Sequence, residues 1–336
     1  MNHSVSFRGT AKEYFSIWIV NSMLKVITLS IYSAWAKVRK RRYLAEKLFI
    51  DDEPFEYLAN PWALFRGWLI AAVAFLIYAG VNHFNPIWAF PLMLVILAFI
   101  PWVVVKSRIF NTRNHSFRNI RFGFAPKYKE AYRVMLGLPL LVPFTFGILL
   151  PYVYYRQRQF FVENTSYGAT PFSFKADVGE FYKLFLLACI WLMGGLILAV
   201  IAIVICVVIE LPKEVIVGVG VLFFVLVYML MLTYIKTEMA NLTWNSTGLG
   251  VLRFRSTMNT LTVFWLYLSG GIAVVLSLGL LFPWASVLLM RYRCERLTII
   301  SDEGIERFIA DTAPSTAGAV GEEIGDLFGL DVDFGF

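Results

Sequence analysis

Long apolar runs, separated by short polar segments, occupy most of the chain. Four of these runs hold 19 or more consecutive, mainly apolar residues, at residues 62–80, 87–105, 181–209 and 215–235. About 20 such residues are enough for a helix to cross a bilayer. The short segments VNHFNP and ELPKE join the runs in two pairs. We therefore predict two helical hairpins that cross the membrane and return.

Three further apolar stretches, at residues 14–36, 132–155 and 261–290, are interrupted. The first contains Asn21, Lys25, Thr28 and Ser30, and the other two contain several prolines and glycines. Such residues break helices and leave backbone groups that protein or water must satisfy at membrane depth. We predict interrupted membrane helices here.

The interrupted stretches resemble one another. A shift of 117 residues aligns FRGTAKEYF, from Phe7, with FAPKYKEAY, from Phe124, and it also aligns LSIYSAW with FGILLPY. A third copy contains LGLLFPW, and a shift of 250 places Ile50 over Ile300. Three internal repeats are therefore predicted. The predicted segments are repeat one at 1–60, a transmembrane hairpin at 61–105, repeat two at 106–180, a second hairpin at 181–235, repeat three at 236–310 and an acidic flexible tail at 311–336.

Short runs with paired aromatics and period-two alternation flank the repeats. They are VSFRG at Val5, FEY at Phe55, IRFGF at Ile120, FSF at Phe172 and VLRFR at Val251. Alternation of this kind indicates short strands, which cannot face lipid. The predicted fold class is a mostly α, polytopic helical membrane protein with internal repeats, interrupted helices and a small cytoplasmic β-layer.

Two topologies follow from this pattern. If each interrupted stretch spans once, the chain crosses seven times, and 20 Lys and Arg residues lie inside against nine outside. If each stretch enters and returns, 28 lie inside and Lys213 alone outside. Lys25 lies at membrane depth in both cases. The positive-inside rule allows both topologies and favours the second.

Composition supports the membrane class. The chain is 59% apolar and 16% charged, with a mean hydropathy of +0.67. Residues 1–300 carry 29 basic and 14 acidic side chains, whereas 301–336 hold nine acids and Arg307. In a membrane protein this positive charge fits cytoplasmic loops, and we expect no nucleic-acid partner. The tail 311–336 is interpreted either as a disordered segment or as a docking peptide.

The first 70 residues carry a specific signature that falls on Phe7, Gly9, residues 18–21, residues 28–32, residues 35–39 and residues 41–43. This signature resembles that of the YjgN family of bacterial inner-membrane proteins. Ser30 stands where the family often has Gly, and Leu58-Ala59 stand where it often has His-Gly, so no role for that histidine carries over. The resemblance implies a multi-pass protein of the bacterial inner (plasma) membrane and no known activity.

Two groups of residues are candidate sites. Asn21, Lys25 and Thr28 form a candidate intramembrane polar site, although the stem of Lys25 could instead carry its charge to the headgroups. Basic clusters either hold anionic lipid headgroups or only set orientation. The candidate headgroup contacts are Lys37, Arg39, Lys40, Arg41, Arg42, Arg113, Arg118 and Arg121.

Catalytic and cofactor patterns are absent from the sequence. Walker, GxSxG and HExxH patterns do not occur, and the three cysteines have neither zinc nor disulfide spacing. We expect no enzyme activity, no cofactor and no metal. Two hypotheses remain: a carrier or lipid-handling protein, and a non-catalytic scaffold that recruits partners through its β-layer and tail.

Overall fold

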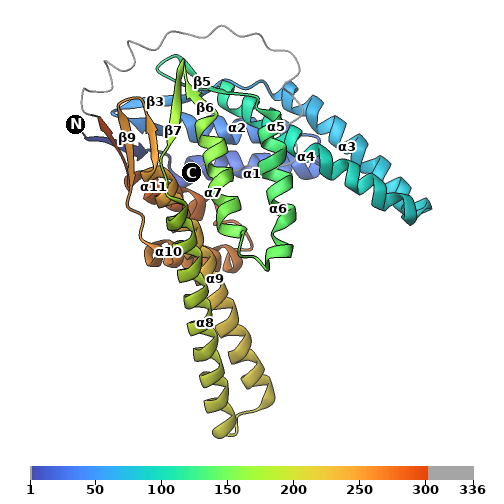
Figure 1. Ribbon diagram of the computed structural model, residues 1–336, viewed down its shortest axis with the longest axis vertical. Coiled ribbons are helices and arrows are strands. Elements are labelled where there is room, and N and C mark those ends of the chain that lie inside the picture. Colours follow the sequence, from blue (N-terminus) through green and yellow to red (C-terminus); the bar gives the residue numbers. More distant parts are fainter. Residues whose placement is uncertain (1, 302–336) are drawn as a thin grey trace.

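A closed antiparallel barrel organises the chain. The computed structural model describes residues 2–301, and its ten strands pair in the circular order β1-β10-β9-β8-β7-β6-β5-β4-β3-β2. The strands lie together in one part of the molecule, and the helices extend away from them (Figure 1). The sequence predicted a small cytoplasmic β-layer, whereas the ten described strands close into a barrel. Because β1 pairs with β10, the sheet has no free edge.

The described chain follows one plan five times: a strand, a pair of helical arms and a strand that pairs with the first. Unit one comprises β1 (Asn2–Phe7), α1 (Ala11–Ile27), α2 (Ser33–Glu46) and β2 (Leu48–Ile50). Unit two comprises β3 (Glu53–Tyr57), α3 (Pro61–Phe84), α4 (Pro86–Asn114) and β4 (His115–Phe117).

The other three units follow the same plan. Unit three comprises β5 (Ile120–Phe124), an arm of α5 (Tyr128–Tyr132), a π-turn (Arg133–Gly137), α6 (Leu138–Leu141) and a 3₁₀ turn (Pro143–Thr145), then α7 (Leu150–Glu163) and β6 (Thr165–Tyr167). Unit four comprises β7 (Thr170–Phe174), α8 (Val178–Val208), α9 (Lys213–Asn245) and β8 (Thr247–Leu249). Unit five comprises β9 (Leu252–Ser256), α10 (Thr260–Leu276), α11 (Phe282–Glu295) and β10 (Leu297–Ser301).

Two-residue turns join consecutive units. Both residues have positive φ in the turns Asp51-Asp52 and Arg118-Asn119, which is the geometry of tight hairpins with the right-handed twist. At the other end of each strand pair, one backbone hydrogen bond closes the unit where its helices begin and end. The five N–H to C=O bonds are Arg8 to Lys47, Leu58 to Asn114, Ala125 to Asn164, Lys175 to Ser246 and Thr257 to Arg296, at 2.8–3.0 Å.

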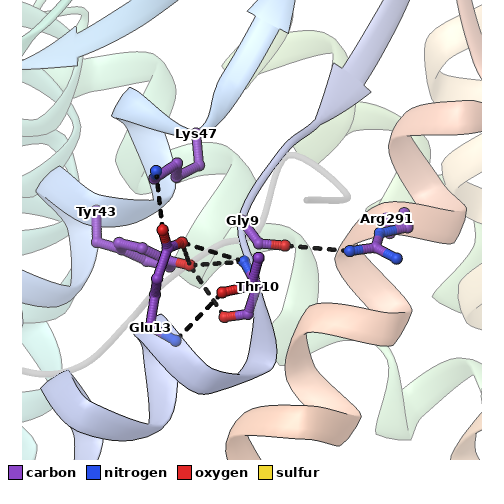
Figure 2. Close-up of polar contacts among 6 residues, drawn as sticks. All are labelled: Gly9, Thr10, Glu13, Tyr43, Lys47 and Arg291. Atoms are coloured by element: carbon purple, nitrogen blue, oxygen red, sulfur yellow. Dashed lines mark hydrogen bonds and ion pairs between the residues drawn. The ribbon is translucent and has the colours of Figure 1, made fainter.

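Helix packing also closes a ring. The second arm of each unit packs on the first arm of the next, in the contacts α2–α3, α4–α5, α7–α8, α9–α10 and α11–α1. At the closing contact, Arg291 of α11 donates to the carbonyl of Gly9 at 3.2 Å (Figure 2). The barrel and the helices around it thus close at the same place.

A polar cluster holds unit one at this point (Figure 2). Thr10 caps α1 by accepting from the Glu13 N–H at 3.2 Å, and the Glu13 carboxylate accepts from the Thr10 N–H at 3.3 Å and from the Tyr43 hydroxyl at 3.1 Å. The bond from the Thr10 backbone, followed by that from Tyr43, lowers the pKa of Glu13. The Thr10 N–H also donates to the Tyr43 hydroxyl at 3.0 Å, and unit five repeats this contact, because the Asn259 N–H donates to the Tyr292 hydroxyl at 2.9 Å. In both units, the tyrosine of the second helix therefore bonds to the start of the first helix: Tyr43 joins α2 to α1, and Tyr292 joins α11 to α10.

Units two and four contain four helices long and apolar enough to cross a membrane, namely α3, α4, α8 and α9. The predicted mostly helical class is thus confirmed, and each of the four long apolar runs forms a helix of sufficient length to span. The two long pairs leave the barrel in different directions (Figure 1). The strand pairing puts the helical hairpins 61–105 and 181–235 inside units two and four rather than between repeats. The tail 311–336 lies outside the described residues.

The short pairs of units one, three and five turn back at similar elbows. Each elbow has two consecutive residues of positive φ: Leu29-Ser30, Phe146-Gly147 and Leu278-Gly279. A hydroxyl oxygen just before them accepts the N–H four residues later. These bonds run from Tyr32 to Thr28 at 3.0 Å, from Leu149 to Thr145 at 3.3 Å and from Leu281 to Ser277 at 3.0 Å. The breaks predicted from polar residues, proline and glycine are these elbows.

Gly9→Ala should destabilise the protein. A methyl group at Gly9 would lie 2.6 Å from the buried Phe7 ring and 2.8 Å from the Tyr43 hydroxyl oxygen, so we expect a loss of about 1–3 kcal/mol. At Gly271, inside α10, a methyl group meets nothing within 4 Å, and Gly271→Ala should raise stability by about 0.5–1 kcal/mol. Thermal unfolding of the detergent-solubilised variants measures both, and a neutral Gly9→Ala would contradict the packing argument.

Opposite substitutions at two elbows should have opposite effects. Gly279 has a φ of +92° and open space around it, so Gly279→Ala adds only backbone strain, about 1 kcal/mol. Ser30 has a φ of 70°, and Ser30→Gly should remove strain and stabilise the protein by about 0.5 kcal/mol after the entropy of the extra glycine is subtracted. The same unfolding measurement applies, and shifts of equal sign would show that the elbows are not strained.

Candidate functional site

The barrel encloses a cavity of about 740 Å³. Ten apolar side chains, one from each strand, form a ring around it. They are Val5, Ile50, Phe55, Phe117, Phe122, Tyr167, Phe172, Leu249, Phe254 and Ile299. Strand pairing sets them opposite each other within units, as in Val5 with Ile50 and Phe122 with Tyr167. Unit one contributes the smaller Val5 where the other four units have phenylalanine.

The ring also fixes the correspondence between units. Val5 and Ile50 correspond to Phe254 and Ile299 in unit five, which is a shift of 249 residues. The predicted alignment of Ile50 with Ile300 is therefore wrong by one residue. Because side chains alternate across a strand, that single residue decides which position faces the cavity.

A second layer of cavity-lining side chains lies nearer the helices. In the second strand of each unit, its residue stands two positions before the ring residue. Its side chains are Leu48, His115, Thr165, Thr247 and Leu297. In the first strands of units one to four, the residue two positions after the ring residue is aromatic and buried, and it is not among the residues that line the cavity. These residues are Phe7, Tyr57, Phe124 and Phe174. The wall therefore becomes more polar toward the helices.

Cationic side chains line the helix end of the cavity. We call Lys37, Lys40, Arg41, Arg108 and Arg293 the basic collar. On α2, Lys37, Lys40, Arg41 and Leu44 follow the spacing i, i+3, i+4 and i+7, which puts them on one helix face. Among the described residues that line the cavity there is no Asp or Glu. The cavity thus combines an apolar interior with a positive entrance.

The collar is one-sided. Its cations come from α2, α4 and α11, whereas α7 and α9 contribute Val162, Thr243 and Trp244. A negatively charged group in the cavity would therefore lie toward units five, one and two. The opposite side offers hydroxyls and apolar surface.

Hydrogen bonds and ring contacts hold the collar in place. Arg41 donates to the Tyr57 hydroxyl at 3.2 Å and to the side-chain oxygen of Asn111. The guanidinium of Arg108 lies over the Phe161 ring, 4.6 Å from its centre, and Arg293 donates to the Tyr267 hydroxyl at 3.1 Å. These contacts hold the three guanidinium groups at the helix end of the cavity.

One polar group lies within the apolar ring. The Tyr167 hydroxyl donates to the Phe117 carbonyl at 2.9 Å, and burial raises the pKa of Tyr167 to about 12. The phenol is therefore neutral and satisfied, and the ring presents no ionised group to a ligand.

The predicted intramembrane residues are not among those that line the cavity. Asn21 is buried and donates to the Ala36 carbonyl at 3.3 Å, which ties α1 to α2. Thr28 belongs to the first elbow, and Lys25 is exposed on α1. The structure does not gather the three around a common space.

The predicted headgroup contacts separate into two groups. Lys37, Lys40 and Arg41 line the cavity. The remaining five lie outside its lining: Arg39 and Arg42 exposed on α2, Arg113 near the end of α4, and Arg118 and Arg121 in the β4–β5 hairpin. Sequence reasoning did not single out Arg108, Arg293 or the aromatic ring as a site. Arg41 and Arg108 occupy corresponding positions on α2 and α4. This repeated basic position is the sequence signal that could have located part of the site.

The described residues hold no cluster of three or more His, Cys, Asp and Glu side chains suited to a metal ion. Cys294 is fully buried, and burial raises its pKa to about 12, which makes it an unreactive thiol. The apolar ring beside the basic collar is suited to an apolar molecule with a negative group.

Comparisons with known proteins agree with the resemblance noted in the sequence. The sequence profile of the family described as "Bacterial protein of unknown function (DUF898)" matches residues 2–327. The inner membrane protein YjgN of Salmonella typhimurium is 33% identical over 150 residues, which are 44% of this chain and 38% of that protein. YjgN of Escherichia coli K12 is 29% identical over 147 residues, 44% of this chain and 37% of that protein.

These alignments cover little more than a third of the relatives' length. No solved structure matches the chain. The family profile, in contrast, spans nearly all of this chain. The chain therefore belongs to the DUF898 (YjgN) family of bacterial proteins of unknown function.

Proposed function

We propose that this chain is an integral inner-membrane protein that holds an anionic amphiphile in its barrel cavity, as a carrier or lipid-handling protein. The observation that carries the proposal is the ring of ten apolar side chains beside the basic collar. The proposal assigns no chemical step to the chain.

Location rests on three arguments. Four helices are long and apolar enough to cross a membrane, and the relatives are named inner membrane proteins. If every helical pair returns to the barrel, 27 of the 29 Lys and Arg residues in the described part of the chain lie on the barrel side, Lys25 lies near a short tip, and Lys213 lies at a far tip. The positive-inside rule then puts the barrel in the cytoplasm.

The chemistry of the cavity selects the class of ligand. Its volume of about 740 Å³ is within the usual range of small-molecule sites. Each methylene buried from water stabilises binding by roughly 0.8 kcal/mol, which favours an alkyl chain within the ring. A carboxylate or phosphate at the collar gains on the order of 1 kcal/mol from each nearby cation. Both a free fatty acid and a phospholipid satisfy this description.

Lys40 and Lys37 provide a test, because charge reversal there places carboxylates in the cavity. The double variant Lys37→Glu/Lys40→Glu should retain at least roughly tenfold less anionic amphiphile, as expected for about 1 kcal/mol or more per changed charge. The matched control is Arg39→Glu/Arg42→Glu, which makes the same charge change on the exposed surface of the same helix.

Native mass spectrometry of the gently purified protein measures the retained molecules. Competition between a fluorescent fatty acid and phosphatidylglycerol vesicles separates the two possible sources. Thermal unfolding of both double variants checks that they fold equally well. Equal losses in both variants would attribute binding to the surface and refute the cavity as the site.

Val5→Phe should change the preferred chain length without a change of charge. The other four units already have phenylalanine at this ring position, so the substitution fits the barrel while it fills part of the cavity. The longest retained acyl chains should become shorter in lipid extracts. Val251→Phe, in an exposed turn, is the control, and unchanged chain lengths in Val5→Phe would exclude a ligand in the ring.

A further inference from the structure

Barrel closure constrains how every helical pair meets the membrane. The strands before and after each pair hydrogen-bond to each other, so both ends of the pair lie at the barrel. The strands of this barrel have three to six residues, too few to cross a bilayer, which takes about nine to eleven residues per strand, so the barrel lies on one side of the membrane. Each pair therefore crosses twice or not at all.

Helix length separates the five pairs into two groups. In all five units the first helix begins four residues after the first strand, so the helices start at the same distance from the barrel along the chain. The 31 residues of α8 extend about 46 Å, whereas the 17 residues of α1 extend about 25 Å. If α8 just spans a hydrocarbon core of about 30 Å, a parallel α1 reaches only about 10 Å into it.

The tips of the two groups differ in chemistry. The tips of the long pairs carry amide, imidazole or charged side chains among apolar ones: Asn82, His83 and Asn85 lie at the α3–α4 tip beside the exposed Phe84 and Ile87, and Glu210 and Lys213 lie at the α8–α9 tip. The short tips have large apolar side chains that are almost fully exposed: Leu29 at 86%, Phe146 at 96% and Leu278 at 94%. Polar tips suit water on the far side, and apolar tips suit hydrocarbon.

The backbone polar groups of the short elbows also form internal hydrogen bonds, as an apolar surrounding requires. Besides the hydroxyl bonds described above, each elbow has an N–H that bonds five residues back: Ser30 to Lys25, Gly147 to Val142 and Gly279 to Val274, at 2.7–3.0 Å. Irregular backbone survives in hydrocarbon only when its polar groups are satisfied internally. Lys25 lies one turn nearer the barrel than Leu29, so its stem can reach the headgroups.

We propose that the short pairs of units one, three and five are re-entrant hairpins that enter the cytoplasmic leaflet and return, with their tips in its hydrocarbon. The described chain then crosses the membrane four times, through α3, α4, α8 and α9. The partner of the three apolar tips is the lipid of one leaflet. This inference is independent of any ligand in the barrel.

Cysteine accessibility in the full-length protein tests the placement. Cys189 and Cys206 are replaced by alanine, and buried Cys294 is kept as the measured baseline. Phe144→Cys and Val275→Cys probe two short tips at exposed positions with ordinary φ. Asn85→Cys marks the far tip of a long pair, and Ala169→Cys marks the exposed β6–β7 turn.

The expected pattern has three parts. A membrane-impermeant maleimide should label Asn85→Cys in spheroplasts and Ala169→Cys only in inverted vesicles. Phe144→Cys and Val275→Cys should react from neither side in the intact membrane, and should react fully once the membrane is dissolved and the protein is denatured, because only the thiolate attacks maleimide. Labelling of either tip in spheroplasts would show a spanning pair, and labelling in inverted vesicles would show a pair outside the bilayer. Each result would overturn the proposal.

Discussion

The pairing of β1 with β10 is the interaction on which the rest of the structure depends. It joins residues at opposite ends of the described chain, Asn2 with Ile300, and it removes the two free edges that ten strands would otherwise present. Short strands of three to six residues hold few backbone bonds each, so closure is what makes them a stable wall. The Arg291 bond to Gly9 and the packing of α11 on α1 strengthen the same seam.

Closure also decides what surrounds the cavity. Once ten strands form a ring, alternate side chains must face inward, and the second helices of the five units must meet at one end of the barrel. The common frame supplies the apolar ring. Differences between units supply its chemistry, because only units one, two and five place cations at the entrance. A ligand preference can thus arise from a few substitutions on a plan that every unit shares.

Variation in arm length is the other consequence of this plan. The same strand ends support α10 with 17 residues and α9 with 33. Lengthening an arm leaves the barrel unchanged, since the backbone bond at its base is the same in every unit. The short arms require elbows whose left-handed residues are strained unless glycine occupies them, and only Ser30 lacks glycine at the second elbow position.

The local patterns of the sequence determined much of this architecture. Apolar runs located the four long helices, polar and glycine interruptions located the elbows, and aromatic alternation located β1, β3, β5, β7 and β9. The shift of 117 residues that aligns Phe7 with Phe124 also relates Val5 to Phe122 and Ile50 to Tyr167 in the barrel.

Tertiary structure alone decided the closed barrel, its second strands and the cavity. The strands β2, β4, β6 and β8 have three residues each, too few to show a period of two, and they form because a helix returns them beside an existing strand. The collar brings Lys40, Arg108 and Arg293 together from three units. Sequence patterns report the local conformation of a segment, whereas its partners depend on how distant segments meet.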